Sequence, residues 1–170
     1  VDSGVDINKV AKRIVSGKFV NCGQTCIAPD YILVNQHVKS ELINAIKDNI
    51  IKTFGNSPKD SESYGRIINK NNLSRLETIL KDQIIEFGGE VSQDRLFIEP
   101  TIIVDPKMDS EIMNEEIFGP ILPILSYENE SEIKDILDFN PTPLAFYIFS
   151  KNKMFIDNLI ENNKFGGCVV

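Results

Sequence analysis

The sequence predicts an α/β domain in which a mostly parallel sheet is flanked by helices on both faces, giving three layers. Three observations support this fold class. Short runs that are apolar throughout recur along the chain, as expected of strands buried on both faces. Segments with helical apolar spacing separate these runs, as in βαβ units. The 170 residues are 42% hydrophobic, which suffices for one domain with a sizeable core.

The expected helices follow from the spacing of their apolar residues. In the first of them, Ile7, Val10, Ile14 and Val15 recur at helical intervals after Asp6, which can cap the helix. A later one has acidic residues in its first turn, where they complement the helix dipole. The predicted helices cover residues 7–15, 38–50, 73–84, a segment starting near residue 130, and 153–161.

The expected strands are short and apolar, and a polar loop rich in Gly, Pro and Ser lies at residues 55–65. The predicted strands cover residues 31–34, 85–87, 96–98, 102–104, 121–127 and 144–149. The apolar end, Cys168–Val170, is predicted to be a further, buried strand. A chain that lacks an initiator Met and ends in such a strand is expected to be one domain of a longer protein.

Composition and charge narrow the classes of function. The net charge is -7 and the acidic residues are spread along the chain, which argues against binding to nucleic-acid phosphates. No apolar stretch reaches the length of a membrane span, and the first residues lack the features of a signal peptide. The three cysteines, in a chain without secretion features, predict free thiols in the cytoplasm.

Cys26 is the candidate reactive residue. It follows the polar segment Asn21-Cys22-Gly23-Gln24-Thr25 and precedes the predicted strand at 31–34. Reactive groups often lie at such junctions, where they can meet a substrate. Gly23 permits a close backbone approach, and Asn21 and Gln24 are expected to shape the loop. On local context alone, a buried and inert thiol is the alternative interpretation.

Two other uses of the thiols fit the spacing less well. A Cys–His hydrolase needs a histidine base, and the one histidine, His37, precedes a predicted helix and is expected to be exposed. A zinc site of Cys22, Cys26, Cys168 and His37 would lack a second close pair of ligands. We therefore expect no metal site.

Two sequence blocks resemble a known family. Gly17–Tyr31, which ends in Gly-Gln-Thr-Cys-Ile-Ala-Pro-Asp-Tyr, resembles the nucleophile region of the aldehyde dehydrogenase superfamily, in particular its class 3 branch for fatty or aromatic aldehydes. Asn114–Pro120 is similar to the Glu-Glu-Ile-Phe-Gly-Pro signature of the family. Further matches, in the family's order, are Tyr64–Ile68, Ile98–Ile102 and Pro143–Ala145. The resemblance covers the whole chain and implies the catalytic domain of that family, with its α/β fold.

The resemblance implies NAD- or NADP-dependent oxidation of an aldehyde to a carboxylic acid. Cys26 would form a thiohemiacetal and then a thioester that water hydrolyses, with its own backbone N–H as an oxyanion donor. Glu116 would bind the nicotinamide ribose hydroxyls, and Phe118 would lie beside the nicotinamide. On local sequence alone, Glu116 is an exposed turn acid and Phe118 a core aromatic residue.

The resemblance also implies which parts of the enzyme are missing. The general-base Glu, the second oxyanion donor (an Asn) and the dinucleotide-binding domain belong to the part before residue 1, and a C-terminal tail belongs after residue 170. No Gly-x-Gly-x-x-Gly motif occurs in the sequence. The isolated chain is therefore expected to be inactive, whereas the longer parent is expected to be a homodimeric enzyme for medium-chain aliphatic or aromatic aldehydes.

Some alternatives stay open at this point. The parent could pass the acyl group to coenzyme A instead of water, although the Ala28-Pro29-Asp30-Tyr31 run favours water. The chain could also be a non-enzymatic α/β binding module that keeps the motif without turnover. Finally, the proximity of Cys22 to Cys26 in the sequence suggests a reversible disulfide under oxidation.

Overall fold

The main sheet has four strands in the order β1-β6-β5-β2, in a computed structural model that describes every residue except 140. β1 is parallel to β6 and β6 is parallel to β5, whereas β2 runs antiparallel to β5. The bounds are β1 (Ile32–Asn35), β2 (Ile85–Phe87), β5 (Thr101–Val104) and β6 (Ile121–Tyr127). β6 lies between two neighbours and is buried along nearly its whole length, which explains its unbroken apolar sequence. The predicted mostly parallel sheet is confirmed.

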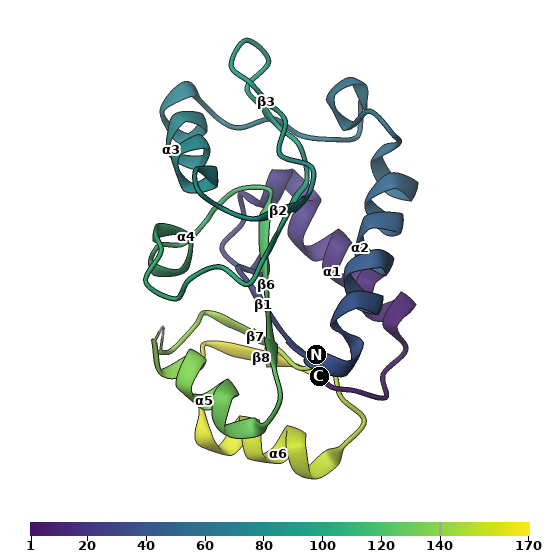
Figure 1. Cartoon of the computed structure of the whole chain (residues 1–170), viewed down its shortest axis with the longest axis vertical. Coiled ribbons are helices and arrows are strands. Elements are labelled where there is room, and N and C mark those ends of the chain that lie inside the picture. The colour runs from purple at the N-terminus through teal and green to yellow at the C-terminus, as the bar shows by residue number, and fades with distance from the viewer. Residues whose placement is uncertain (140) are drawn as a thin grey trace.

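Helices lie on both sides of this sheet (Figure 1). α1 (Ile7–Phe19) packs against α2 (Lys39–Phe54) on one side, and α3 (Lys70–Leu80) lies on the other with the short α4 (Glu111–Asn114). Asp6 caps α1 by accepting a hydrogen bond from the Lys9 backbone N–H at 3.1 Å, as predicted. The arrangement gives the three expected layers.

The C-terminal part forms a smaller unit with its own parallel two-stranded sheet and two helices (Figure 1). Its elements are α5 (Glu130–Phe139), β7 (Ala145–Tyr147), α6 (Lys153–Asn162) and β8 (Gly167–Val169). A separate apolar cluster holds this unit together; its buried members are Tyr127, Ile133, Leu137, Ile148 and Phe155. Tyr127 belongs to β6, so the cluster joins this unit to the main sheet.

The structure corrects or adds to several details of the sequence prediction. α3 ends at Leu80 instead of residue 84, because Lys81 is extended and Asp82 has a left-handed φ of 63°. Ile84 is therefore outside the helix and 67% exposed. The predicted strand at 96–98 is one arm of a hairpin, β3 (Val91–Ser92) with β4 (Phe97–Ile98), and α4 was not predicted. β8 forms as expected but is not buried, since Val169 and Val170 are 59% and 63% exposed.

Short 3-10 turns connect several of these elements. They are η1 (Val20–Gly23), η2 (Gln36–Val38) and η3 (Pro58–Asp60). η1 follows α1 directly and begins the segment that contains Cys26, so the candidate site lies between the first helix and the first strand of the sheet. None of the described helices combines the length and the apolar composition that a bilayer span requires.

Candidate active site

The loop that contains Cys26, residues 20–30, has three consecutive residues in the left-handed backbone region directly after Val20. The φ angles are 51° at Asn21, 54° at Cys22 and 70° at Gly23. This conformation costs an L-residue roughly 1–2 kcal/mol, least for Gly and Asn. A run of this kind persists only where neighbouring groups hold it in place.

Gln24 holds the left-handed run and joins it to a distant segment. Its side-chain Nε2 donates to the Asn21 carbonyl at 3.0 Å and to the Arg66 carbonyl at 2.9 Å. Its Oε1 accepts from the Ile68 backbone N–H at 2.9 Å. The Asn21 side chain in turn donates to the Gln24 carbonyl at 3.2 Å. These bonds use both the donor and the acceptor of the amide, which agrees with the predicted shaping role of Asn21 and Gln24.

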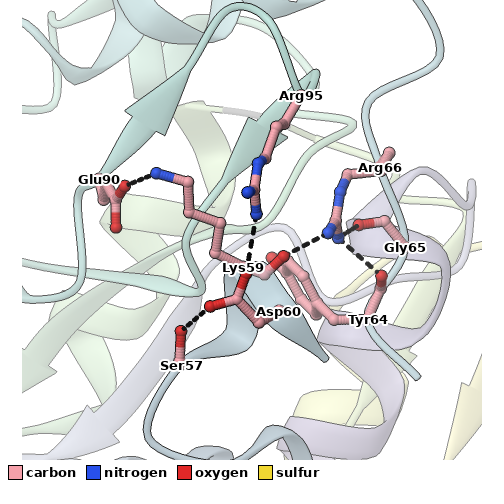
Figure 2. A network of polar contacts seen from close by, with 8 residues as sticks. All are labelled: Ser57, Lys59, Asp60, Tyr64, Gly65, Arg66, Glu90 and Arg95. Atoms are coloured by element: carbon pink, nitrogen blue, oxygen red, sulfur yellow. Dashed lines mark hydrogen bonds and ion pairs between the residues drawn. The ribbon is translucent and has the colours of Figure 1, made fainter. Parts of the chain in front are cut away.

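The segment that Gln24 contacts is itself fixed by Arg66. The Arg66 guanidinium donates to the carbonyls of Lys59 at 2.5 Å, Tyr64 at 2.9 Å and Gly65 at 2.9 Å, as Figure 2 shows. It also lies 5.3 Å from the centroid of the Phe97 ring, within the range of a cation–π contact. Further polar contacts of the same loop join Lys59 to Glu90, Arg95 to Asp60 and Ser57 to Asp60 (Figure 2).

Cys26 lies in a tight turn in which the Ala28 backbone N–H donates to the Thr25 carbonyl at 2.9 Å. Its side chain is exposed. The Tyr147 hydroxyl of β7 donates to the Ile27 carbonyl at 2.8 Å, so the turn is held from that side as well as by Gln24. Across all described residues, 1–139 and 141–170, the Cys26 backbone N–H donates to no acceptor. This donor is therefore available to a bound molecule.

The Glu116–Phe118 segment approaches the Cys26 loop through two glycines. A Cβ atom on Gly23 would lie 2.2 Å from the Gly119 carbonyl oxygen, so only glycine fits at that contact. Glu116 and Phe118 are exposed, Phe118 by 41%. Cys26 and Glu116 both line one cleft of about 590 Å³, whereas Phe118 is not among its lining residues. The structure thus brings two of the three predicted site residues to one cleft.

A buried lysine, Lys18, and a half-buried aspartate, Asp30, belong to the surroundings of this site, and the sequence prediction missed both. Burial lowers the pKa of Lys18 to about 8, although the nearby carboxylates of Asp30 and Glu116 partly offset that effect. Burial also raises the pKa of Asp30, against the opposing influence of the Lys18 ammonium. The signal for Lys18 was its position in the sequence: it lies four residues after Ile14, on the apolar face of α1.

Cys22 differs from Cys26 in its environment. It is only 1% exposed, and burial raises the pKa of its thiol to about 11, against the lowering effect of the Tyr64 hydroxyl. The Cys22 thiol is therefore protonated at neutral pH, and a buried thiol reacts slowly because the thiolate is the reactive form. These observations argue against a Cys22–Cys26 disulfide as a response to oxidation.

The remaining candidate ligands are dispersed. His37 is exposed in η2, where its backbone N–H donates to the Asn35 side chain at 3.1 Å, and it does not line the cleft with Cys26. Cys168 lies in β8 and is partly exposed. Among the described residues, no three His, Cys, Asp or Glu side chains are grouped so that they could hold a metal ion.

Comparisons with known proteins identify the class to which this fold and these sequence blocks belong. The sequence pattern of the aldehyde dehydrogenase family matches residues 1–170. Mouse aldehyde dehydrogenase family 3 member A2 is 41% identical over 167 residues, which are 98% of this chain and 34% of that protein. The 4,4'-diaponeurosporen-aldehyde dehydrogenase of Staphylococcus aureus is 42% identical over 169 residues, 98% of this chain and 37% of that protein.

A solved structure gives the same result. The substrate-bound state of Staphylococcus aureus AldH matches with a TM-score of 0.95 and 40% identity, over 99% of this chain and 37% of that one. The chain belongs to the aldehyde dehydrogenase family. The predicted resemblance and the predicted fold class are confirmed, and the relatives include members of family 3. The chain spans about a third of the length of the relatives it matches.

Proposed function

We propose that the longer protein containing this chain oxidises an aldehyde to a carboxylic acid with NAD or NADP, and that residues 1–170 form its nucleophile-bearing domain. Membership of the aldehyde dehydrogenase family supports the proposal. The observation on which it chiefly depends is that an exposed Cys26, in a turn held from two sides, lines the same cleft as Glu116.

The residues of the chain suit a covalent mechanism at Cys26. The thiolate of Cys26 attacks the aldehyde carbonyl, and negative charge develops on the carbonyl oxygen. The Cys26 backbone N–H, which donates to no acceptor among the described residues, can donate to that oxygen. Because Gln24 and Tyr147 hold the turn, sulfur and donor keep a fixed relation to each other. Sulfur is also a good leaving group when water hydrolyses the resulting thioester.

The cleft residues fit the nicotinamide end of a dinucleotide. The exposed carboxylate of Glu116 in the cleft offers acceptor oxygens for ribose hydroxyls. Phe118, two residues further along the chain and outside the cleft lining, is exposed and offers an apolar surface. A nicotinamide ring bound there would supply the acceptor for the hydride of the substrate. The roles of Glu116 and Phe118 come from the resemblance of Asn114–Pro120 to the family signature.

We further propose that the 170-residue chain is inactive by itself. Attack by Cys26 and hydrolysis of its thioester need a general base. Cys22 is buried and His37 does not line the cleft; Asp30, Glu115 and Glu116 do line it, but the resemblance assigns the role of base to none of them. The resemblance assigns the general base and the second oxyanion donor to a part of the family sequence that residues 1–170 do not contain.

The test uses the full-length parent with a medium-chain aliphatic or aromatic aldehyde and NAD or NADP. We expect release of the acid and, in mass spectra of enzyme trapped during turnover, an acyl adduct on Cys26. A Cys26→Ser variant with full activity, or an adduct on another residue, would contradict covalent catalysis by Cys26. Turnover that requires coenzyme A would identify the acylating type. A homodimeric parent and a cytoplasmic location stay predictions.

A further inference from the structure

The Glu116–Phe118 segment has a strained backbone. Phe118 has a left-handed φ of 47°, which is rare for a residue with a large side chain. Its ring is 41% exposed, so burial of the ring does not account for this conformation. Strained residues persist where the surrounding structure holds them, and they cluster at functional sites. The groups that hold Phe118 therefore bear on the function proposed for its segment.

Two charged side chains hold the residue next to Phe118 from opposite ends of its backbone. The Ile117 backbone N–H donates to a carboxylate oxygen of Asp30 at 3.0 Å. The Ile117 carbonyl accepts from Nη2 of Arg75 at 2.6 Å, and Nη1 of the same guanidinium lies 3.5 Å from the Glu116 carbonyl oxygen. Hydrogen bonds with a charged partner are stronger than those between neutral groups.

These contacts come from two different parts of the fold. Arg75 belongs to α3, and its neighbour Leu76 lies so close to Gly119 that a Cβ there would be 2.5 Å from Leu76 Cδ2. Asp30 follows the Cys26 turn and lines the cleft with Cys26 and Glu116. The segment is thus held between α3 and the Cys26 loop.

Lys18 is the third charged residue that interacts with this segment. Its side chain is 1% exposed on α1, and its ammonium interacts electrostatically with both Asp30 and Glu116. Asp30 is half-buried, which raises the pKa of its carboxyl group, whereas Lys18, Arg75 and the Ile117 N–H act in the opposite direction. Asp30, the residue that accepts the hydrogen bond from the Ile117 N–H, is therefore itself stabilised by neighbouring positive charges.

From this geometry we infer that Arg75 and Asp30 are positioning residues that hold Glu116 and Phe118 in the conformation that binds the nicotinamide nucleotide. Neither residue needs to touch the cofactor, because each acts on the backbone of Ile117. This inference rests on the proposed function, since it assumes that Glu116 and Phe118 bind the cofactor. It adds α3, which lies outside the sequence blocks of the family resemblance, to the cofactor site.

The test compares Arg75→Met with wild type in the full-length parent. Methionine removes the donors to Ile117 and Glu116 while keeping an unbranched side chain. We expect the KM for NAD or NADP and the Kd for NADH to rise about tenfold, with the aldehyde KM within about twofold of wild type. A general loss of structure would not separate the two KM values. Arg13→Met, on the exposed face of α1, is the matched control and should change neither.

Two further variants keep the test decisive. Arg75→Lys retains the charge but lacks the two-pronged donor, so about a threefold rise in the cofactor KM is expected. It replaces Arg75→Met if that variant does not fold. Asp30→Asn, which keeps an acceptor but loses the charge, should affect the same constants.

The outcomes separate this inference from the proposed function. Arg75 variants that fold and keep the cofactor KM and the NADH Kd within about twofold of wild type would overturn the inference. A wild-type parent that binds NADH but does not oxidise aldehydes would contradict the proposed function alone, and NADH binding would still decide the role of Arg75. A wild-type parent that binds neither NADH nor NADPH overturns both.

Discussion

The buried ammonium of Lys18 makes the stability of the chain depend on pH with a sign that can be worked out. Burial lowers its pKa from 10.5 to about 8, a value that already includes the attraction of Asp30 and Glu116. Below pH 8 the lysine is protonated in both states, but between pH 8 and pH 10.5 the unfolded chain binds the additional proton. The free energy of unfolding therefore rises with pH in this window. At 1.36 kcal/mol per unit of pKa difference, the Lys18 contribution changes by about 3 kcal/mol between neutral pH and pH 10.5.

Urea unfolding of wild type and Lys18→Met, followed by circular dichroism across this pH range, tests the calculation. Other groups titrate in the same window: burial raises the pKa of Cys22 from 9.0 to about 11, so its titration lowers stability as the pH rises above 9. These contributions are common to both proteins and cancel in the difference. We expect the stability of wild type relative to Lys18→Met to increase by about 3 kcal/mol from neutral pH to pH 10.5.

A matched control separates burial from the mere presence of a lysine. Lys12 lies on the same helix and is exposed, so Lys12→Met is the matched control for replacing a lysine on α1 by methionine. If the difference between wild type and Lys18→Met changes by less than about 1 kcal/mol over the whole range, the lysine is hydrated in the folded chain and the reasoning is wrong.

Three other substitutions test how the Cys26 loop is held. Gln24→Ala removes the three bonds to Asn21, Arg66 and Ile68, and should lower the free energy of unfolding by about 3 kcal/mol in urea titrations, since each hydrogen bond contributes about 1 kcal/mol. Gly23→Ala places a Cβ 2.2 Å from the Gly119 oxygen at a left-handed φ, so the free energy of unfolding should fall by about 3 kcal/mol in the same assay. An unchanged free energy of unfolding would mean that the two loops separate without cost. Tyr147→Phe removes the bond to the Ile27 carbonyl and should reduce kcat of the full-length parent by about tenfold with the cofactor KM unchanged, and wild-type kcat would show that Gln24 alone holds the turn.

Local sequence patterns predicted most of the helices and strands, because the residues that are buried in these elements also follow the spacing and capping that each element requires. α1 begins at Ile7, after the Asp6 cap, because apolar period and cap coincide, and β6 follows from its unbroken apolar run. α3 was predicted too long because Ile84 continues the apolar spacing, whereas the left-handed Asp82 ends any possible helix before it. Apolar spacing alone cannot register such a backbone change.

The site was predictable only where its residues stand in a recognisable block. Cys26 and Glu116 belong to such blocks, and the structure places both on one cleft. Arg75 stands alone on an ordinary amphipathic helix, and its contact with the Ile117 carbonyl depends on how α3 packs against a segment distant in sequence. The role of Tyr147 could not be predicted from the sequence either. It depends on the hydrogen bond from its hydroxyl to the Ile27 carbonyl, and only the fold brings these two groups together.

The contact between Gly23 and Gly119 gives a physical reason for two of the glycines in these blocks. Each block places a glycine where a side chain would collide, Gly23 with the Gly119 carbonyl and Gly119 with Leu76 of α3. The loop that bears the nucleophile and the segment that bears Glu116 therefore approach each other backbone to backbone, with no side chain between them that could repack. Because close-packed contacts have low compressibility, a shift of one backbone segment at this contact also shifts the other. A change at either glycine should consequently move Cys26 relative to Glu116, so reaction at the thiol and binding of the cofactor should be lost together.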